Sequence, residues 1–281
     1  MRLLFFIFIL FIAGCKPEKD KTILTVQPET LIHPPIGDTA LPPVVNEGSL
    51  VADTIMPIQY SIVPNSDSLA LVIWKEYTGD SLAVMMALNR VDLAHMHKPD
   101  SIIIPDRFYS LNAYSPFPYH LPELDTLEKI ILVSSRLQAI GFYQNGNLVR
   151  WGPVSMGKKS TPTPKGFYHT NWKSKSTVST ENDQWILNWY FNLENFRGVS
   201  FHEYELPGYP ASHSCIRLLA EDAEFLYYFA NQWKLTSEGK IESNGTPVII
   251  FGFYNFGKRR PWRYLADQPE KAVVKQVEIV F

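Results

Sequence analysis

The one cysteine in the body of the chain, Cys215, follows two histidines, His213 two residues before it and His202 thirteen residues before it. A cysteine attacks a carbonyl carbon as its thiolate, and an imidazole held beside it can accept the thiol proton. The residue types therefore predict a nucleophile–base pair formed by Cys215 with His202 or His213. The alternative interpretation is a buried structural cysteine with two ordinary surface histidines.

The sequence around the cysteine resembles a known enzyme signature. The run Ser-His-Ser-Cys-Ile-Arg-Leu at residues 212–218 is similar to the Ser-His-Gly-Cys-Ile-Arg-Leu signature of L,D-transpeptidases, whose catalytic domain is of the YkuD type. His202 matches the histidine that the family places on the preceding strand. The segments Pro153–Gly157 and Thr161–Tyr168 resemble the family's other recurrent stretch. The resemblance covers about residues 127–253.

The resemblance implies acyl transfer on the stem peptides of bacterial peptidoglycan. Cys215 would attack the carbonyl of the third residue of a donor stem and expel the terminal D-amino acid, which leaves a thioester. An amine of an acceptor stem would then take the acyl group and give a 3-3 cross-link, or another amine acceptor would be attached. Two alternatives stay open: an L,D-carboxypeptidase-type enzyme in which water trims the stem, and a non-catalytic wall-binding lipoprotein.

The resemblance also implies a role for each residue near the nucleophile. His202 would be the base and would hold the thiolate as an ion pair, with Glu203 or a nearby backbone carbonyl orienting its ring. His213 would have a positioning or a second proton-transfer role. The backbone N–H groups of Ser214 and of the nucleophile would bind the oxyanion, and Arg217 would fix the loop or meet the substrate carboxylate. This chemistry needs no metal and no organic cofactor.

The chain departs from the family pattern at two points. Ser214 stands where the family has glycine, and the loop from His202 to Ser212 is short for the family. A glycine in such a loop often supplies a positive φ or allows close approach of the substrate. Serine at that position would cost about 1 kcal/mol of strain, or would narrow the oxyanion site.

Composition limits the classes of partner. The chain has 281 residues, of which 46% are hydrophobic and 14% aromatic, as in a globular protein with a large core. Its formal net charge of −2 gives no indication of a nucleic-acid partner.

The N-terminus predicts a lipid-anchored protein of the bacterial cell envelope. Residues 1–15 have the pattern of a signal peptide, with Arg2 before the apolar run Leu3–Ile12, which is too short to span a bilayer as a helix. The run ends in Ile-Ala-Gly-Cys, which resembles a lipobox with Cys15 as the lipidated residue. We therefore expect a periplasmic protein attached to a membrane, with the outer membrane favoured. The proline-rich residues 16–59 are expected to form a linker.

Residues 60–106 are predicted to form a small α/β module. The expected order is a strand, two helices and a strand, at Tyr60–Val63, Ser68–Tyr77, Ser81–Asn89 and Ser101–Pro105. This order resembles a lysin-motif (LysM) module, a glycan-binding unit. The competing interpretation is a helical extension that packs on the catalytic domain. Residues 107–126 are expected to be a connector.

The elements that must position Cys215 are mostly strands. Residues 127–253 predict a mainly β catalytic domain with flanking helices (α+β), a sandwich or barrel of the L,D-transpeptidase type, followed by a C-terminal extension over residues 254–281. Strands are expected at residues 129–134, 139–143, 148–156, 185–191 and 248–251. Asn145-Gly146 predicts a type I′ hairpin turn. After Cys215 the apolar stripe from Asp222 to Trp233 predicts an amphipathic helix.

Overall fold

The structure is a computed structural model that describes residues 57–179 and 182–279. The predicted signal peptide with its lipidation site Cys15 lies outside the described residues, as does the predicted linker up to residue 56. The described residues all fall within one compact unit. Among them no helix combines the length and the apolar character that crossing a membrane requires.

A nine-stranded mixed sheet forms the body of the protein, with strand order β6-β13-β3-β4-β5-β10-β9-β8-β7. Its strands are β3 (Lys129–Ser134), β4 (Ala139–Gln144), β5 (Asn147–Ser155), β6 (Gly166–His169), β7 (Lys173–Val178), β8 (Ile186–Glu194), β9 (Val199–Glu203), β10 (Ile216–Leu218) and β13 (Pro247–Phe251). The pairs β13–β3 and β10–β9 are parallel, and the other neighbours are antiparallel. The predicted fold class, mainly β with flanking helices, is confirmed.

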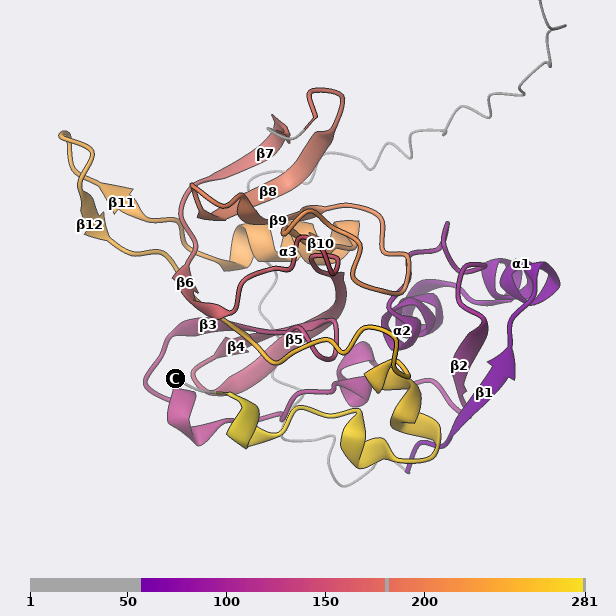
Figure 1. Cartoon of the computed structure of the whole chain (residues 1–281). Helices are drawn as coiled ribbons and strands as arrows, with labels where there is room; N and C mark the ends of the chain where they lie inside the picture. Colours follow the sequence, from indigo (N-terminus) through magenta and orange to yellow (C-terminus); the bar gives the residue numbers. More distant parts are fainter. Residues whose placement is uncertain (1–56, 180–181, 280–281) are drawn as a thin grey trace, which may run out of the picture. The chain divides into compact units, whose positions relative to one another are not determined.

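The sheet has a core on each of its faces. One core contains side chains from β3, β4 and β5, from β8 and β9, and from helix α3 (Ala220–Phe229). In Figure 1, strands β3–β5 lie below α3 and strands β7–β9 lie above it. The opposite face of β3–β5 is covered by residues of the predicted connector and of the C-terminal extension, including Phe117, Leu124 and Val274. Strand β3 contributes side chains to both cores because its side chains alternate between the two faces.

Most of the predicted elements are found near their expected bounds. The hairpin turn between β4 and β5 has positive φ at Asn145 (46°) and Gly146 (73°), as a type I′ turn requires. The predicted helix after Cys215 is shorter than expected, because the backbone is already extended at Ala230 and the N–H of Trp233 bonds to the carbonyl of Asn171 instead. The described part of the chain also contains a small hairpin and five 3-10 turns: β11 (Lys234–Leu235), β12 (Ile241–Ser243), Leu111–Tyr114, Pro122–Leu124, Pro261–Ala266, Pro269–Lys271 and Gln276–Glu278.

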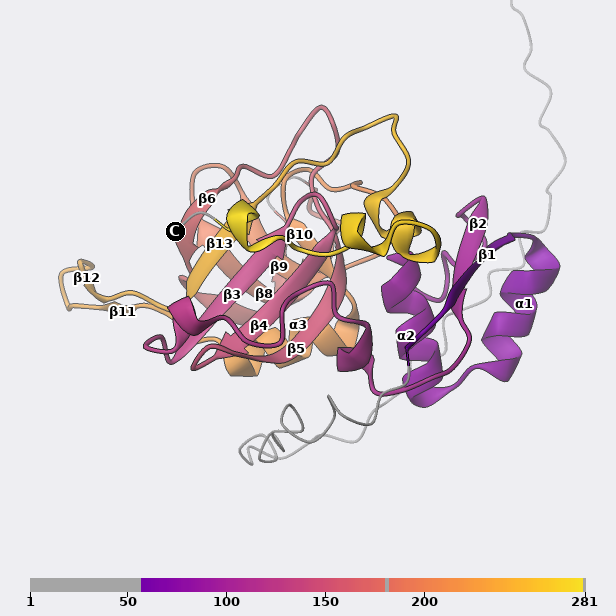
Figure 2. The same ribbon diagram turned by 90° about the horizontal axis from the view of Figure 1, so that it is seen from below.

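The N-terminal module has the predicted order of elements: β1 (Tyr60–Pro64), α1 (Asp67–Glu76), α2 (Gly79–Asn89) and β2 (Ser101–Pro105). Strands β1 and β2 pair antiparallel, and Ser66 caps α1 by accepting the N–H of Leu69. Helix α2 is buried on two sides. Met85 packs in the module's own core, whereas Val84 and Leu88 pack in the core under β3–β5, and Figure 2 shows α2 on the side of the module that faces the sheet. Glycan binding by this module stays a prediction.

A buried arginine joins the module to the rest of the protein. Arg90 follows α2 with φ of 59°, and its guanidinium lies 5.2 Å from the ring centre of Trp151 on β5 and 5.5 Å from that of Trp262 in the C-terminal extension. Its Nε donates to the carbonyl of Leu137 at 2.9 Å. Burial lowers the pKa of Arg90 to about 9, so the side chain remains charged at neutral pH.

Candidate active site

The register of β9 and β10 places the predicted site residues on one face of the sheet. These strands are parallel, and Arg217 lies beside His202. Phe201 and Ile216 point into the core and are fully buried. Side chains alternate along a strand, so Cys215, just before β10, lies on the face of Arg217 and His202. All three residues line a cavity of about 140 Å³.

The thiol of Cys215 is held from two sides. The hydroxyl of Ser200 donates to Sγ at 3.2 Å, and the thiol donates to the carbonyl of Gly198 at 3.2 Å. A hydroxyl donor stabilises negative charge on sulfur, so Ser200 favours the thiolate once the proton has left. The sequence analysis did not single out Ser200. Ser200 could have been found from its position two residues before His202 on a predicted strand, because this spacing places both side chains on the same face.

His202 is buried with 4% of its surface exposed, and its ring is fixed by a backbone carbonyl. Nδ1 lies 2.8 Å from the carbonyl oxygen of Glu203, which can only accept, so Nδ1 carries the hydrogen and Nε2 keeps its lone pair. The orienting group is thus the backbone of Glu203. Glu203 also lines a separate cavity of about 520 Å³.

The charge state of His202 differs from the sequence-based expectation. Burial lowers the pKa of His202 to about 4, although its hydrogen bond to Glu203 acts in the opposite direction. Burial therefore favours a neutral imidazole at physiological pH, whereas the sequence-based expectation is a thiolate–imidazolium ion pair with Cys215. A neutral imidazole with a lone pair on Nε2 is instead suited to accept the thiol proton during attack.

His213 lies at the edge of the same cavity and is exposed. Its Nε2 accepts a hydrogen bond from the ammonium of Lys158 at 2.9 Å, and its ring centre lies 5.7 Å from that of Trp185. The structure thus brings His202, His213 and Cys215 to one cavity, but only His202 is buried.

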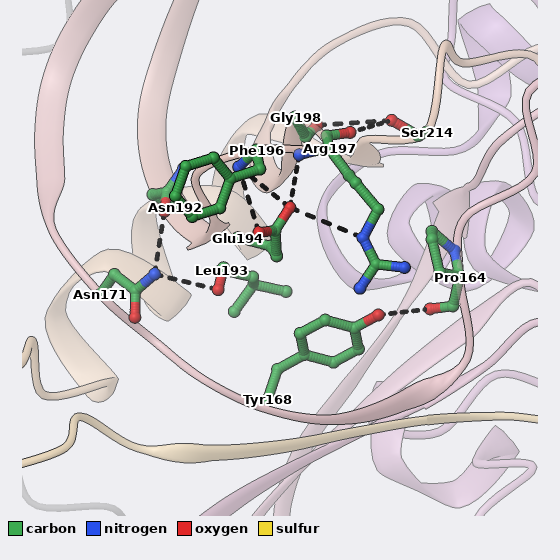
Figure 3. A network of polar contacts seen from close by, with 10 residues as sticks. All are labelled: Pro164, Tyr168, Asn171, Asn192, Leu193, Glu194, Phe196, Arg197, Gly198 and Ser214. Carbon is green, nitrogen blue, oxygen red and sulfur yellow. Dashed lines mark hydrogen bonds and ion pairs between the residues drawn. The ribbon is translucent and has the colours of Figure 1, made fainter.

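Ser214 adopts the backbone conformation that the family glycine would supply. Its φ is 104°, and its hydroxyl donates to the carbonyls of Arg197 (3.2 Å) and Gly198 (3.4 Å) (Figure 3). Its N–H donates to Oγ of Ser212 at 3.2 Å. The expectation that this N–H binds the oxyanion is therefore not met in the resting structure, because the group already has an intramolecular acceptor.

The turn between β8 and β9 supplies the carbonyls that hold this loop. Glu194 accepts the N–H groups of Phe196, at 3.1 Å, and of Arg197, and its Oε2 lies 3.8 Å from Nε of Arg197 (Figure 3). The carboxylate thereby fixes the turn whose carbonyls at residues 197 and 198 contact Ser214 and the thiol. The sequence analysis did not identify Glu194, which carries no motif of its own.

The two sequence stretches that resemble the family meet at the nucleophile loop. Oγ1 of Thr163 donates to the carbonyl of Ser214 at 2.8 Å and accepts the N–H of Gly157 at 2.9 Å. Ser212 forms a parallel bridge with Gly157, and its N–H donates to the carbonyl of Met156. A Cβ at Gly157 would lie 2.2 Å from a carbonyl oxygen, so this close approach requires glycine.

Arg217 contacts the segment that follows β9. Its guanidinium carbon lies 4.4 Å from the ring centre of Tyr204, and Nη1 lies 3.5 Å from the carbonyl of Glu205. Tyr204 also lines the cavity, and its ring centre lies 5.8 Å from that of His202. The geometry fits the expectation that Arg217 fixes the loop. Arg217 also lines the cavity, and its contact with a substrate carboxylate stays a prediction.

Among residues 57–179 and 182–279, no cluster of three or more His, Cys, Asp or Glu side chains is placed to hold a metal ion. The chemistry available in the cavity is that of a thiol, a neutral imidazole, hydroxyls and backbone groups. These are the groups that acyl transfer through a thioester requires.

Comparison with known proteins gives one family match. Residues 128–250 match the family model of the L,D-transpeptidase catalytic domain, YkuD. Solved L,D-transpeptidases from Stackebrandtia nassauensis (21% identity, TM-score 0.38) and Mycobacterium smegmatis (20% identity, TM-score 0.34) align with 46% and 44% of this chain, and each alignment covers 58% of the other chain. An L,D-transpeptidase from Mycobacterium tuberculosis aligns at 23% identity and TM-score 0.34 over 54% of this chain and 72% of its own. The chain thus spans less than two thirds of the first two structures. No curated protein matches the chain.

Proposed function

Because residues 128–250 match the family model of the L,D-transpeptidase catalytic domain, YkuD, we propose that this protein transfers acyl groups between peptidoglycan stem peptides through a thioester on Cys215. One observation carries the proposal. The thiol lies between the Ser200 hydroxyl and the Gly198 carbonyl, in the cavity that the buried, neutral His202 also lines.

The first half of the reaction forms the thioester. Nε2 of His202 accepts the thiol proton as Sγ of Cys215 bonds to the carbonyl carbon of the third stem residue. The tetrahedral intermediate then expels the amine of the terminal D-amino acid, which takes the proton from the imidazolium. The hydrogen bond from Nδ1 to the carbonyl of Glu203 keeps the ring oriented through both transfers.

The second half transfers the acyl group. The amine of an acceptor stem attacks the thioester and loses a proton to His202, and the thiolate of Cys215 leaves and is reprotonated. With an amine acceptor the product is a 3-3 cross-link. Water as the acceptor would make the protein a stem-trimming carboxypeptidase.

Oxyanion stabilisation falls to donors other than Ser214. The N–H of that residue is bonded to Oγ of Ser212, which also donates to the carbonyl of Cys215 at 2.5 Å. We propose that the backbone N–H of Cys215, the other donor expected from the sequence, contributes to binding the oxyanion. One such donor is typically worth about 3 kcal/mol in the transition state.

We extend the proposal to the location of the protein. The Ile-Ala-Gly-Cys sequence at the end of the apolar N-terminal run supports lipidation of Cys15 and attachment to a membrane facing the periplasm. Such an anchor would keep the catalytic domain near the cell wall. A diacylglyceryl mass on Cys15 of the protein isolated from cells tests this part of the proposal.

The test of the reaction uses defined muropeptides and mass spectrometry. We expect the parent protein to give an acyl adduct on Cys215 and then dimers or trimmed stems, and Cys215→Ala to give neither while it keeps the parent's circular dichroism. Dimers identify an amine acceptor, and trimmed monomers identify water. Products formed by the Cys215→Ala variant at the parent rate would show that another group carries the reaction.

A further inference from the structure

The N-terminal module binds directly to the segment that follows the catalytic histidine strand. The N–H of Asp92 donates to the carbonyl of Leu206 at 3.0 Å, and the N–H of Leu206 donates to Oδ2 of Asp92 at 2.7 Å. Val91 and Pro207 form an antiparallel bridge beside this pair. Leu206 is fully buried. A residue just after α2 is thereby attached to the loop between His202 and Ser212.

The carboxylate of Asp92 is itself held in place. Its Oδ1 accepts the N–H of His95 at 2.8 Å, and Nδ1 of the same histidine lies 2.8 and 2.9 Å from the two carboxylate oxygens. Nε2 of His95 lies 3.7 Å from Oε2 of Glu205. The side chain of Asp92 is only 20% exposed. A carboxylate with several donors and little exposure forms strong, directional hydrogen bonds.

The segment that Asp92 holds forms part of the wall of the Cys215 cavity. The carbonyl of Glu205 faces Nη1 of Arg217, whose guanidinium lies over the ring of Tyr204. Tyr204 and Arg217 both line the cavity. Glu205 and Tyr204 immediately precede the residue that Asp92 binds, so displacement of Leu206 would displace both contacts of Arg217.

We propose that Asp92 is a positioning residue for the acyl transfer, and that through it the N-terminal module forms part of the catalytic apparatus. Asp92 touches no reacting atom. It fixes Leu206, and with it the positions of Tyr204 and Arg217 against which a stem peptide binds. The inference rests on the proposed function for its effect on catalysis, whereas the attachment of the loop can be measured without any substrate. It needs no glycan binding by the module.

The test compares Asp92→Ala and Asp92→Asn with a matched control in the same module. Asp100 makes an ion pair with Arg263 of the C-terminal extension, is 78% exposed, and does not contact residues 204–207. Asp100→Ala therefore removes another carboxylate that joins the module to the rest of the chain. Three quantities are measured on the full chain: amide exchange at residues 204–206, acylation kinetics with a stem peptide, and alkylation of Cys215 by iodoacetamide.

We expect Asp92→Ala to speed amide exchange at residues 204–206 and to lower kcat/KM for acylation about tenfold, mainly through KM, because a charged hydrogen bond to the loop is lost. Alkylation by the small reagent should stay within about twofold of the parent rate, since thiol and base are untouched. Asp92→Asn keeps one acceptor oxygen, so its exchange and its acylation kinetics should lie between those of the parent and those of Asp92→Ala. Asp100→Ala should match the parent in all three measurements.

Unchanged exchange at residues 204–206 in Asp92→Ala would overturn the proposal. So would an equal loss of acylation and alkylation, because this would indicate collapse of the whole site. If Asp92→Ala does not fold, the Asp92→Asn variant decides by the same criteria. A parent protein that no stem peptide acylates would refute the proposed function, and the exchange data would still decide whether Asp92 holds the loop.

Discussion

Ser214 combines a glycine-like backbone with side-chain contacts that glycine cannot make. Its φ of 104° is strained for an L-residue, and its hydroxyl donates to two carbonyls of the β8–β9 turn. One of these carbonyls, that of Gly198, also accepts the thiol hydrogen of Cys215. The strain and the hydroxyl contacts therefore have opposite effects on the stability of the same loop.

Two substitutions separate these effects. Ser214→Gly removes the strain and the hydroxyl, whereas Ser214→Ala removes only the hydroxyl. We expect the free energy of unfolding to be about 1 kcal/mol higher for Ser214→Gly than for Ser214→Ala, because glycine adopts a positive φ without strain. Urea denaturation of both variants measures the difference. Equal stabilities would show that φ at residue 214 carries no strain.

The same pair of variants tests whether the serine has a chemical role. If Ser214 is a tolerated replacement for glycine, Ser214→Gly should form the thioester at the parent rate or faster, as measured with one carbapenem at fixed pH. Acylation slower by about tenfold or more in both variants would contradict this expectation and would make the hydroxyl part of the site.

His202 gives the protein a specific dependence of stability on pH. Its pKa is about 4 in the folded state, against about 6.5 for an unperturbed histidine. The unfolded chain therefore binds a proton at higher pH than the folded chain does. The contribution of the neutral, buried ring is fully present above pH 6.5 and is lost as the pH falls toward 4.

A difference between two proteins isolates this effect. Between pH 7.5 and pH 5 the free energy of unfolding should fall by about 2 kcal/mol more in the parent than in His202→Gln, which cannot titrate at that position. Urea denaturation of both proteins at the two pH values checks it. Parallel losses would mean that the pKa of His202 is not lowered. A smaller loss in the parent than in His202→Gln would mean that its pKa is raised, as an ion pair with the Cys215 thiolate requires.

At the scale of elements, the strands and turns that carry their own local signal could be predicted from the sequence. Strand β3 has an unbroken apolar run, and the β4–β5 turn has Asn145-Gly146, whose positive φ values are a local property. The end of helix α3 was not predictable from its apolar stripe. Trp233 continues the stripe but bonds to the distant Asn171, a contact that periodicity does not encode.

The candidate site also contains residues that the sequence predicted and residues that it did not. Cys215, His202 and His213 belong to a recognisable pattern, and the structure brings them to one cavity. Glu194 was missed because one carboxylate on a hairpin has no spacing that distinguishes it from a solvated residue. For Ser200 the only signal was its position two residues before His202, which does not show that it contacts Cys215. Their relevance arises only when β9 pairs with β10 and the β8–β9 turn meets the nucleophile loop.

The two hydrogen bonds between Asp92 and Leu206 are also contacts that the sequence could not predict. The two residues are 114 positions apart, and each lies in a loop whose local sequence predicts only a connection. For the N-terminal segment the sequence left two interpretations open: an independent glycan-binding module, and an extension packed on the catalytic domain. In the structure α2 packs against the core under β3–β5, and glycan binding stays a separate prediction.

At the scale of the whole molecule, Arg90 joins three regions that are distant in the sequence. It belongs to the N-terminal module, it lies between Trp151 of β5 and Trp262 of the C-terminal extension, and it donates to the carbonyl of Leu137. Within the described residues it makes no ion pair with a carboxylate. The electrostatic attraction of two aromatic faces and the backbone acceptor therefore offset the cost of burying its charge.

This arrangement predicts that the module and the β domain unfold together in the parent and separately when Arg90 is replaced. Arg90→Ala should lower the free energy of unfolding by about 2–4 kcal/mol, because it leaves a cavity between the two indoles and an unpaired carbonyl at Leu137. Arg90→Met fills most of the volume without the charge and should lose less. Calorimetry should show one transition for the parent and two for Arg90→Ala. Hydrogen exchange on Arg90→Ala should show amide protection lost earlier in α1 and β2 than in β3 and β4. A single, unshifted transition in Arg90→Ala would mean that the apolar face of α2, with Val84 and Leu88, is sufficient to hold the module on the sheet.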